Sequence, residues 1–292
     1  MIVGIDLGGT QVRVAIADAE GRIAEVARVA TIELDGPAGM VAWAREQAGV
    51  LAGGAPIEIV GIGVPGPCDP HAGILTNPPN LAGWPPGVPL GTLLREAFGV
   101  PVHLENDANL AALSEFRRGA GRGSRNLAYV TWSTGIGSGL ILDGKLYSGT
   151  NGTAGEIGHM VLDPQGPPCM CGMRGCVEAY ASGSSIARRA GRPASEVFAG
   201  AAAGEPGAIA IVEQAALMVG LALLNLANLV DPERIVIGGG ITGSWHLIEE
   251  ALGRPIRDSP FMIPARRPAI LKAELGVDVG LVGAVEWALQ HR

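Results

Sequence analysis

The sequence has little positive charge, few cysteines and no apolar run long enough for a typical membrane span. Its 292 residues include 21 lysines and arginines against 28 aspartates and glutamates, a formal net charge of −7. Such an acidic chain argues against binding to nucleic acid or to an anionic membrane. The longest apolar stretch, 215–230, contains Asn225 and Asn228 and predicts a buried helix. Asp6 interrupts the first apolar run, so we expect no secretory signal and a cytoplasmic protein.

Hydrophobic residues make up 48% of the chain, which excludes long disordered stretches and suffices for two domains. Apolar periodicity predicts an α/β fold. The expected strands cover 1–7, 12–17, 26–31, 57–64, 102–105, 127–132, 140–142 and 235–237, and the expected helices cover 39–51, 90–98, 106–118 and 280–290.

The order strand, Thr/Gly turn, strand occurs twice, first after Asp6 and again around 133–139. This repetition predicts two related halves. We place their boundary in the Gly/Arg segment 119–124. Residues 1–118 are then a small N-terminal α/β domain and 119–279 a large α/β domain, and the C-terminal helix, 280–292, packs back on the first.

Three of the four cysteines, Cys169, Cys171 and Cys176, fall within eight residues, and His159 lies just upstream. Three thiolates and one imidazole form a tetrahedral shell that Zn²⁺ prefers, and a shell made only of protein groups is typical of a structural site. The alternatives are buried free thiols, or a disulfide, which the closeness of Cys169 and Cys171 disfavours. We expect zinc in the loop 159–176, and we expect the remaining cysteine, Cys68, in the core.

Three glycine-rich segments each follow an apolar strand. Gly8, Gly9 and Thr10 come after Asp6, and the other two segments are 133–139 and 238–240. Bare backbone N–H groups in such turns bind phosphate oxygens, and a nearby carboxylate holds Mg²⁺ through water. One such segment is a weak signal, but three together predict nucleotide binding, with a flat base near 238–240.

Two apparent nucleotide motifs are rejected. Segment 61–66 satisfies the dinucleotide pattern, but Pro65, Pro67 and Pro70 prevent the helix that must follow it. Segment 139–146 nearly satisfies the P-loop pattern, but it lacks the final Ser or Thr and predicts a hairpin turn instead.

Glu105, Asn106 and Asp107 lie at a predicted strand-to-helix junction. One interpretation is that Asn106 or Asp107 only caps the helix. The other is that Asp107 acts as a general base, because phosphoryl transfer to an alcohol needs a carboxylate that accepts the hydroxyl proton. Glu156 and Glu178 flank the metal loop and suit sugar hydroxyls, although solvation is the usual fate of a surface glutamate.

Taken in order, these segments resemble the ROK family (repressor, open reading frame, kinase), which includes bacterial glucokinases, fructokinases, N-acetylmannosamine kinases and N-acetylglucosamine kinases. The resemblance covers nearly the whole chain. It rests on Asp6-Leu-Gly-Gly-Thr10, Pro79-Asn80-Leu81, Glu105-Asn106-Asp107, Thr134-Gly-Ile-Gly137, Glu156-Ile-Gly-His159, Cys169-x-Cys171-Gly-x-x-Gly-Cys176-Val-Glu178 and Gly238-Gly-Gly240.

The resemblance implies an actin-like, ribonuclease-H-like fold in which two α/β domains flank a cleft for Mg-ATP and a hexose. It implies that Asp107 is the catalytic base and that the protein is a homodimer. The implied sugar contacts are Gly66, Asn80, Asn106, Asp107, Glu156, His159 and Glu178. The implied ATP and Mg²⁺ contacts are Asp6, Gly8, Gly9, Thr10, Gln11, Thr134, Gly135, Gly137, Gly239 and Gly240. The implied zinc ligands are His159, Cys169, Cys171 and Cys176.

Three departures from the family pattern stand out. Gln11 occupies a position where many members have Lys, so we expect one phosphate contact to be lost. Ser138 stands where a third Gly is common, and we expect it to be tolerated. Segment 192–208 is short and Ala-rich, so we expect the large domain to be trimmed there.

The expected reaction is transfer of the γ-phosphate of ATP to the 6-hydroxyl of a hexose. Glucose is the first choice, because 77–84 resembles glucokinases; N-acetylmannosamine or another hexose is the alternative, because 163–167 resembles N-acetylmannosamine kinases. A sugar-sensing repressor would carry a DNA-binding segment before the motif at Asp6, and the acidic charge argues against one. A silent sugar-binding module is disfavoured by Asp107, although Gln11 leaves some room for it.

Overall fold

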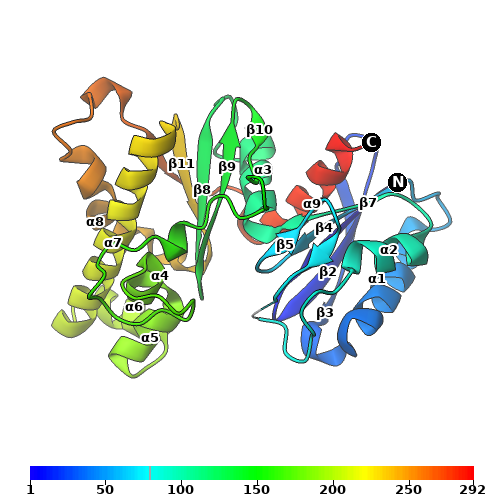
Figure 1. The fold of residues 1–292 in the computed structure, drawn as a ribbon, viewed down its shortest axis with the longest axis horizontal. Coiled ribbons are helices and arrows are strands. Elements are labelled where there is room, and N and C mark those ends of the chain that lie inside the picture. Colours follow the sequence, from blue (N-terminus) through cyan, green and yellow to red (C-terminus); the bar gives the residue numbers. More distant parts are fainter. Residues whose placement is uncertain (79) are drawn as a thin grey trace. The chain divides into compact units, whose positions relative to one another are not determined.

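The computed structural model describes residues 1–78 and 80–292 and divides into two units (Figure 1). Unit 1 contains Met1–Gly119, Ser148–Ala154 and Val277–Arg292, and unit 2 contains Ala120–Tyr147 and Gly155–Gly276. Pro79, part of the Pro79-Asn80-Leu81 motif, lies outside the described residues. Each unit holds its own hydrophobic core and its own sheet.

The sheet of unit 1 has the strand order β3-β2-β1-β4-β7. Its strands are β1 (Ile2–Leu7), β2 (Gln11–Ala17), β3 (Ile23–Ala30), β4 (Ile59–Val64) and β7 (Val102–Asn106). The pairs β1–β2 and β2–β3 are antiparallel, whereas β4 and β7 continue the sheet in parallel. Helices α1 (Gly36–Ala52) and α2 (Leu90–Phe98) pack on one face, and α3 (Asp107–Arg118) and α9 (Val279–Gln290) cover the other (Figure 1).

Helix α9 lies directly on the sheet because two strand positions are glycines. A Cβ atom on Gly61 would come within 1.9 Å of the carbonyl oxygen of Ala284, and one on Gly4 within 2.7 Å of Val285. Any side chain at Gly61 would therefore push the helix away. Val277–Arg292, which contains this C-terminal helix, belongs to unit 1.

The segment Ser148–Ala154 departs from the single boundary that the sequence predicted, because it belongs to unit 1. The Ser148 hydroxyl donates to Glu105 Oε2 at 3.0 Å. A Cβ atom on Gly152 would lie 2.8 Å from the carbonyl oxygen of Cys68. Contacts between residues this far apart in the chain leave no periodic signal in the sequence.

The sheet of unit 2 has the order β10-β9-β8-β11-β12, with the same sequence of antiparallel and parallel pairs as unit 1. Its strands are β8 (Leu127–Trp132), β9 (Ile136–Leu142), β10 (Lys145–Leu146), β11 (Arg234–Gly238) and β12 (Ala269–Lys272). The expectation of two related halves is confirmed. One turn was predicted too long: β9 already begins at Ile136, because that residue pairs with Trp132, so only 133–135 form the turn.

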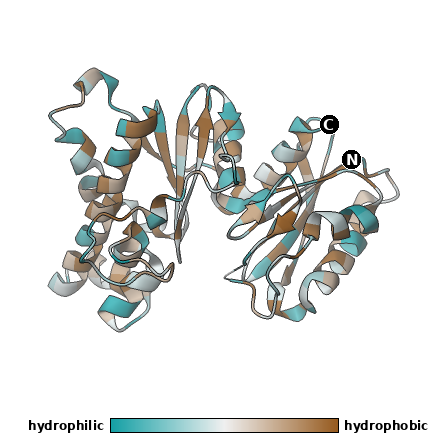
Figure 2. Cartoon of the chain, in the orientation of Figure 1, coloured by the Kyte–Doolittle hydropathy of each residue, from teal (hydrophilic) through white to brown (hydrophobic). Residues whose placement is uncertain are grey.

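The helices of unit 2 are α4 (Val177–Ala181), α5 (Gly183–Ala190), α6 (Ala194–Ala202), α7 (Pro206–Val230) and α8 (Trp245–Arg257). By length and composition alone, α7 could cross a membrane. Its residues Ala215, Val219 and Leu223 are instead buried in one core with apolar residues of β8 and β11. Figure 2 shows hydrophobic residues along this helix and on these strands. This burial confirms the predicted core helix.

Short elements complete the chain: β5 (Cys68–Asp69) pairs with β6 (Ile74–Leu75), and single 3-10 turns occupy Thr31–Glu33, Ile157–His159, Gly240–Ser244, Pro264–Arg266 and Gly276–Asp278. Cys68 is buried, as expected for a core thiol, and its burial raises the pKa of the thiol well above the ordinary value. No helix follows 61–66, so the rejection of a dinucleotide motif holds.

Candidate functional site

The first glycine turn, Gly8 to Thr10, joins β1 to β2 and is fixed from both sides. The Gly8 N–H donates to the carbonyl of Gln11 at 3.0 Å, and the Thr31 hydroxyl donates to the carbonyl of Gly8 at 2.7 Å. Gly9 and Thr10 are exposed, so their surface is accessible to a ligand. A Cβ atom on Gly9 would lie 2.7 Å from the carbonyl oxygen of Asn80. The turn, a predicted ATP contact, and Asn80, a predicted sugar contact, are therefore direct neighbours.

Asp6 ends β1 beside this turn, and Arg13 on β2 pairs with it across the two strands. Arg13 Nε and Nη2 donate to Asp6 Oδ2 at 3.0 Å and 2.6 Å, and Nη1 donates to the carbonyl of Val277 at 2.5 Å. The other carboxylate oxygen, Oδ1, faces Gly280 at the start of α9. Nothing in the motif at Asp6 indicated that an arginine would hold this carboxylate.

Asn106 caps α3, as the simpler of the two interpretations held. Its Oδ1 accepts the N–H groups of Ala108 at 2.9 Å and Asn109 at 3.2 Å, and its Nδ2 donates to the carbonyl of Gly66 at 3.2 Å. Gly66 has φ +78°, a left-handed conformation that favours glycine. This capping brings Gly66 and Asn106 together and leaves Asp107 as the first residue of the helix.

Asp107 is exposed at the N-terminus of α3, and its Oδ1 accepts the N–H of Ala108 at 2.8 Å. Helix N-termini stabilise anions, and the bond from Ala108 holds the carboxylate in one orientation. A carboxylate at the surface of a strand-to-helix junction has the chemistry of a general base.

A buried carboxylate, that of Glu105, stabilises the junction between β7 and α3. Glu105 is 1% exposed. Its Oε1 accepts the N–H of Asn106 at 2.8 Å and Nδ2 of Asn109 at 2.9 Å, and its Oε2 accepts the Ser148 hydroxyl. A buried charge with three donors is stable where an unpaired one would not be. No function of its own was predicted for Glu105, although a charged residue inside a predicted strand was a signal.

In unit 2, the second and third glycine segments line one pocket of about 670 Å³. Ser133 and Thr134 come from the turn before β9, and Gly240 comes from the segment after β11. Gly239 has φ +90°, and a Cβ atom there would lie 2.3 Å from the carbonyl oxygen of Trp132. A pocket of this size, with polar groups at the glycine turns, suits a nucleotide.

The far wall of this pocket was not predicted. It consists of one face of α6: Ala194, Ser195, Phe198, Ala199 and Ala202. The sequence predicted only that this Ala-rich segment shortens the domain, whereas its small residues at helical spacing also leave room for a ligand. Gly137 also differs from its predicted place in the turn, because it pairs with Thr131 inside the sheet.

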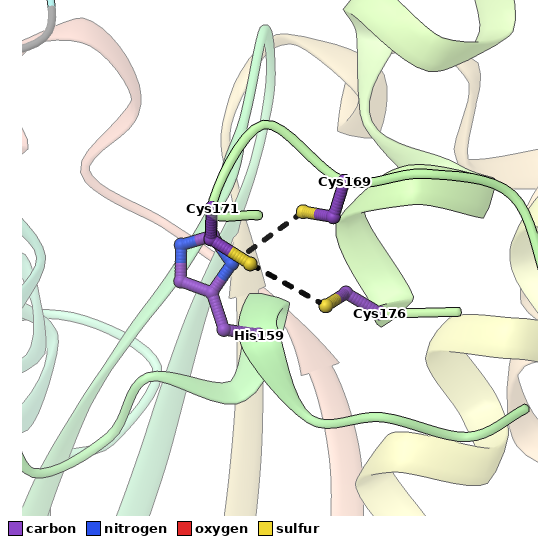
Figure 3. Close-up of side chains that lie close together, drawn as sticks. All are labelled: His159, Cys169, Cys171 and Cys176. Atoms are coloured by element: carbon purple, nitrogen blue, oxygen red, sulfur yellow. Dashed lines mark hydrogen bonds between the residues drawn. The ribbon is translucent and has the colours of Figure 1, made fainter. Parts of the chain in front are cut away.

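The predicted zinc ligands come together in unit 2. The ligand atoms of His159, Cys169, Cys171 and Cys176 all lie within 4.8 Å of one another (Figure 3). The Cys171 and Cys176 sulfurs are 3.7 Å apart, and the Cys169 sulfur is 3.8 Å from His159 Nδ1. Tetrahedral Zn–S bonds of about 2.3 Å place two sulfurs about 3.8 Å apart, so the donor set fits zinc. All four cysteines are free, so the disulfide alternative fails.

The backbone of the loop holds these ligands in place. Leu162 N–H donates to the carbonyl of Gly175 at 2.9 Å, and Val177 N–H donates to the carbonyl of Met160 at 3.0 Å. Burial raises the pKa of Cys176 to about 12 and also raises the pKa of Cys169, whereas the backbone N–H of Met173 lowers the pKa of Cys171. A metal would therefore displace protons from the two buried thiols.

Two glutamates flank the metal loop. Glu156 is exposed immediately before the 3-10 turn that carries His159. Glu178, on α4, is half-buried, and its Oε2 accepts the N–H of Ile136 at 2.9 Å. The surface-solvation alternative therefore does not describe Glu178, which contacts the start of β9.

The chain is similar to known proteins over nearly its whole length. The model of the ROK family matches residues 2–291. A glucokinase from Halalkalibacterium halodurans is 34% identical over 96% of this chain and 92% of its own length. An N-acetylmannosamine kinase from Citrobacter koseri is 36% identical over 97% of this chain and 96% of its own.

A solved structure extends the likeness to the fold. The ROK family glucokinase from Streptomyces griseus, in complex with glucose and AMPPNP, superposes with a TM-score of 0.82 at 32% identity, covering 99% of each chain. This likeness confirms the expected actin-like α/β fold. From the extent of the family match and of these relatives, the chain belongs to the ROK family.

Proposed function

We propose that the protein is an ATP-dependent hexose kinase that transfers the γ-phosphate of ATP to the 6-hydroxyl of a hexose, glucose being the first choice. The observation that carries the proposal is the exposed Asp107 carboxylate at the start of α3, fixed by the capping of Asn106 and the buried Glu105. Family membership and the glucokinase relatives support it.

In this mechanism Asp107 accepts the proton of the sugar hydroxyl as its oxygen attacks the γ-phosphate. A positioned base contributes about 10²–10⁴-fold to such a step. The sugar is held by Gly66, Asn80, Asn106, Glu156, His159 and Glu178. The capping bonds hold the Asn106 amide in a fixed orientation, so a hydroxyl would meet a preorganised partner.

Mg-ATP is held by both glycine turns. In unit 1 the contacts are Asp6, Gly8, Gly9, Thr10 and Gln11, and in unit 2 they are Thr134, Gly135, Gly137, Gly239 and Gly240. Arg13 holds Oδ2 of Asp6, so Oδ1 is the oxygen that would orient a water of the magnesium shell. The metal neutralises charge that develops on the phosphoryl group, which needs little covalent help from the protein.

Zinc, bound by His159, Cys169, Cys171 and Cys176, is proposed to be structural, since four protein ligands leave no open position for chemistry. We further propose that the protein is cytoplasmic and forms a homodimer. The four free cysteines support a reducing compartment, and the dimer rests on family resemblance alone. Light scattering of the purified protein at several concentrations would test the dimer.

The proposed function is tested by ADP release from Mg-ATP with a panel of glucose, mannose, fructose, allose, N-acetylglucosamine and N-acetylmannosamine. We expect glucose to give the highest kcat/KM. N-Acetylmannosamine is the second candidate, because one N-acetylmannosamine kinase is 36% identical to this chain. Detectable sugar binding by calorimetry without turnover on any sugar would contradict the kinase and favour a sensor.

A second test concerns the contact between the first glycine turn and Asn80. Gly9→Ala would place a methyl group 2.7 Å from the carbonyl oxygen of Asn80, so one of the two segments must move. We expect KM for ATP or for the hexose to rise at least about fivefold. The control is Gly49→Ala in α1, where the nearest atom is the end of the flexible Arg45 side chain. Unchanged kinetics for Gly9→Ala would show that the turn does not contact substrate.

A further inference from the structure

The glycine turn of unit 2 is held from one side by Glu178. Glu178 Oε2 accepts the N–H of Ile136 at 2.9 Å, and a Cβ atom on Gly135 would lie 2.9 Å from the same oxygen. The N–H of Ser133 is bonded to the carbonyl of Gly135 at 3.0 Å. Within the described part of the chain, the N–H groups of Thr134 and Gly135 are therefore the ones in this turn that remain available to a phosphate.

Residues 155–158 also contact this strand. The Ser138 hydroxyl donates to the carbonyl of Gly155, and Ser138 is buried. Gly155 has φ +89°, and a Cβ atom there would come within 2.9 Å of the Ser138 carbonyl oxygen. A Cβ atom on Gly158 would lie 2.2 Å from the carbonyl oxygen of Ile136. Residues 155–158 and Glu178 thus fit closely against β9.

The two flanks of the loop are joined to each other by the metal ligands. Cys176 is fully buried two residues before Glu178, and His159 follows Gly158 directly. A metal bound by both residues fixes the positions of Glu178 and of 155–158 together. Without it, the loop keeps only its backbone hydrogen bonds, which allow larger fluctuations in both flanks.

We propose that the metal loop sets the affinity for nucleotide, with Glu178 and Ser138 as positioning residues that hold the 133–135 turn in its phosphate-binding conformation. This inference rests on the proposed function, because it takes that turn to be a nucleotide contact. In this proposal Ser138 is more than a tolerated replacement of glycine, because its hydroxyl helps to hold the turn. Glu178 holds the turn even when no sugar is bound.

The experiment is titration of ADP with Mg²⁺ into zinc-loaded protein by calorimetry, with no sugar present. Loss of a buried hydrogen bond of this kind corresponds to about tenfold in affinity. We expect Glu178→Ala to raise the Kd for ADP about tenfold and Ser138→Ala about threefold or more. Glu178→Gln should bind ADP nearly as the wild type does, because its amide oxygen still accepts the Ile136 N–H.

Matched controls lie in the same unit. Ser124 is a buried serine whose hydroxyl donates to the carbonyl of Gly121 at 2.7 Å, so Ser124→Ala removes the same kind of bond elsewhere. Glu233 Oε1 accepts the N–H groups of Arg125 and Asn126, so Glu233→Ala is the counterpart of Glu178→Ala. Both controls should bind ADP with wild-type affinity.

Removal of zinc by a chelator should weaken ADP binding as Glu178→Ala does, and zinc should restore it. Because both act on one turn, stripping zinc from Glu178→Ala should add little further loss. Hydrogen exchange of the amides in 133–139 should accelerate in the zinc-free protein. Wild-type affinity and exchange in both the stripped protein and the Glu178→Ala variant would overturn this inference alone. A wild-type protein that binds no ADP would overturn the proposed function and this inference with it.

Discussion

Asp107→Asn is expected to lower kcat by at least about 10²-fold while hexose binding changes little. The asparagine keeps an oxygen that can accept the Ala108 N–H, and the cap at Asn106 is untouched, so α3 should begin where it does now. What is lost is the basicity of the carboxylate. The measurement is steady-state turnover of the preferred sugar, with sugar affinity determined separately by calorimetry.

The matched control for this variant is Asp18→Asn. Asp18 also accepts backbone N–H groups in unit 1, from Glu20 at 3.0 Å and Arg22 at 2.9 Å, but it lies in the turn between β2 and β3. Its replacement should leave kcat unchanged. If Asp107→Asn turned over at nearly the wild-type rate, the base would have to be sought elsewhere.

Cys171→Ser is expected to abolish stoichiometric zinc binding and to destabilise unit 2 by more than about 3 kcal/mol. Cys171 is exposed, so replacing its sulfur by oxygen removes almost no packing, and the loss reports the metal alone. A change of that size corresponds to a fall in Tm of about 6–12 °C for a unit of this size. Zinc content by mass spectrometry of metals and thermal unfolding are the two measurements.

Cys68→Ser provides the contrast, because Cys68 is buried outside the cluster. It should lower Tm by burying a hydroxyl group in an apolar site while zinc content stays at the wild-type level. If Cys171→Ser retained both zinc and its unfolding temperature, the metal assignment would be wrong.

Local patterns predicted much of the secondary structure. The helix at 90–98 has the predicted bounds because Pro89 and Gly99 mark its ends, and the strand at 127–132 has them because it is a nearly continuous apolar run. The grouping of His159 with Cys169, Cys171 and Cys176 was also predictable, since these residues lie close together in sequence. The repeated strand–turn–strand pattern predicted the two related sheets, although it did not predict their strand order.

Sequence patterns did not predict the contacts between residues that lie far apart in the chain. Ser148 on Glu105 and Glu178 on Ile136 each join a side chain to a group more than 40 residues away in the chain, which periodicity does not bring together. The end of the second turn was missed because glycine signals a turn, whereas the pairing of Ile136 with Trp132 decides where a strand begins. Tertiary pairing outweighed local propensity there.

Because α9 packs closely on β1 and β4, unit 1 can complete its fold only after α9 has been synthesised. Ile2 and Ile59 share a small core with Val285 and Ala288, so the part of the sheet face that α9 covers stays exposed until α9 has left the ribosome. Unit 2 is by then complete, since it ends at Gly276. The N-terminal unit should therefore be the second to mature, and a nascent chain stopped near residue 276 should expose an apolar sheet that chaperones recognise.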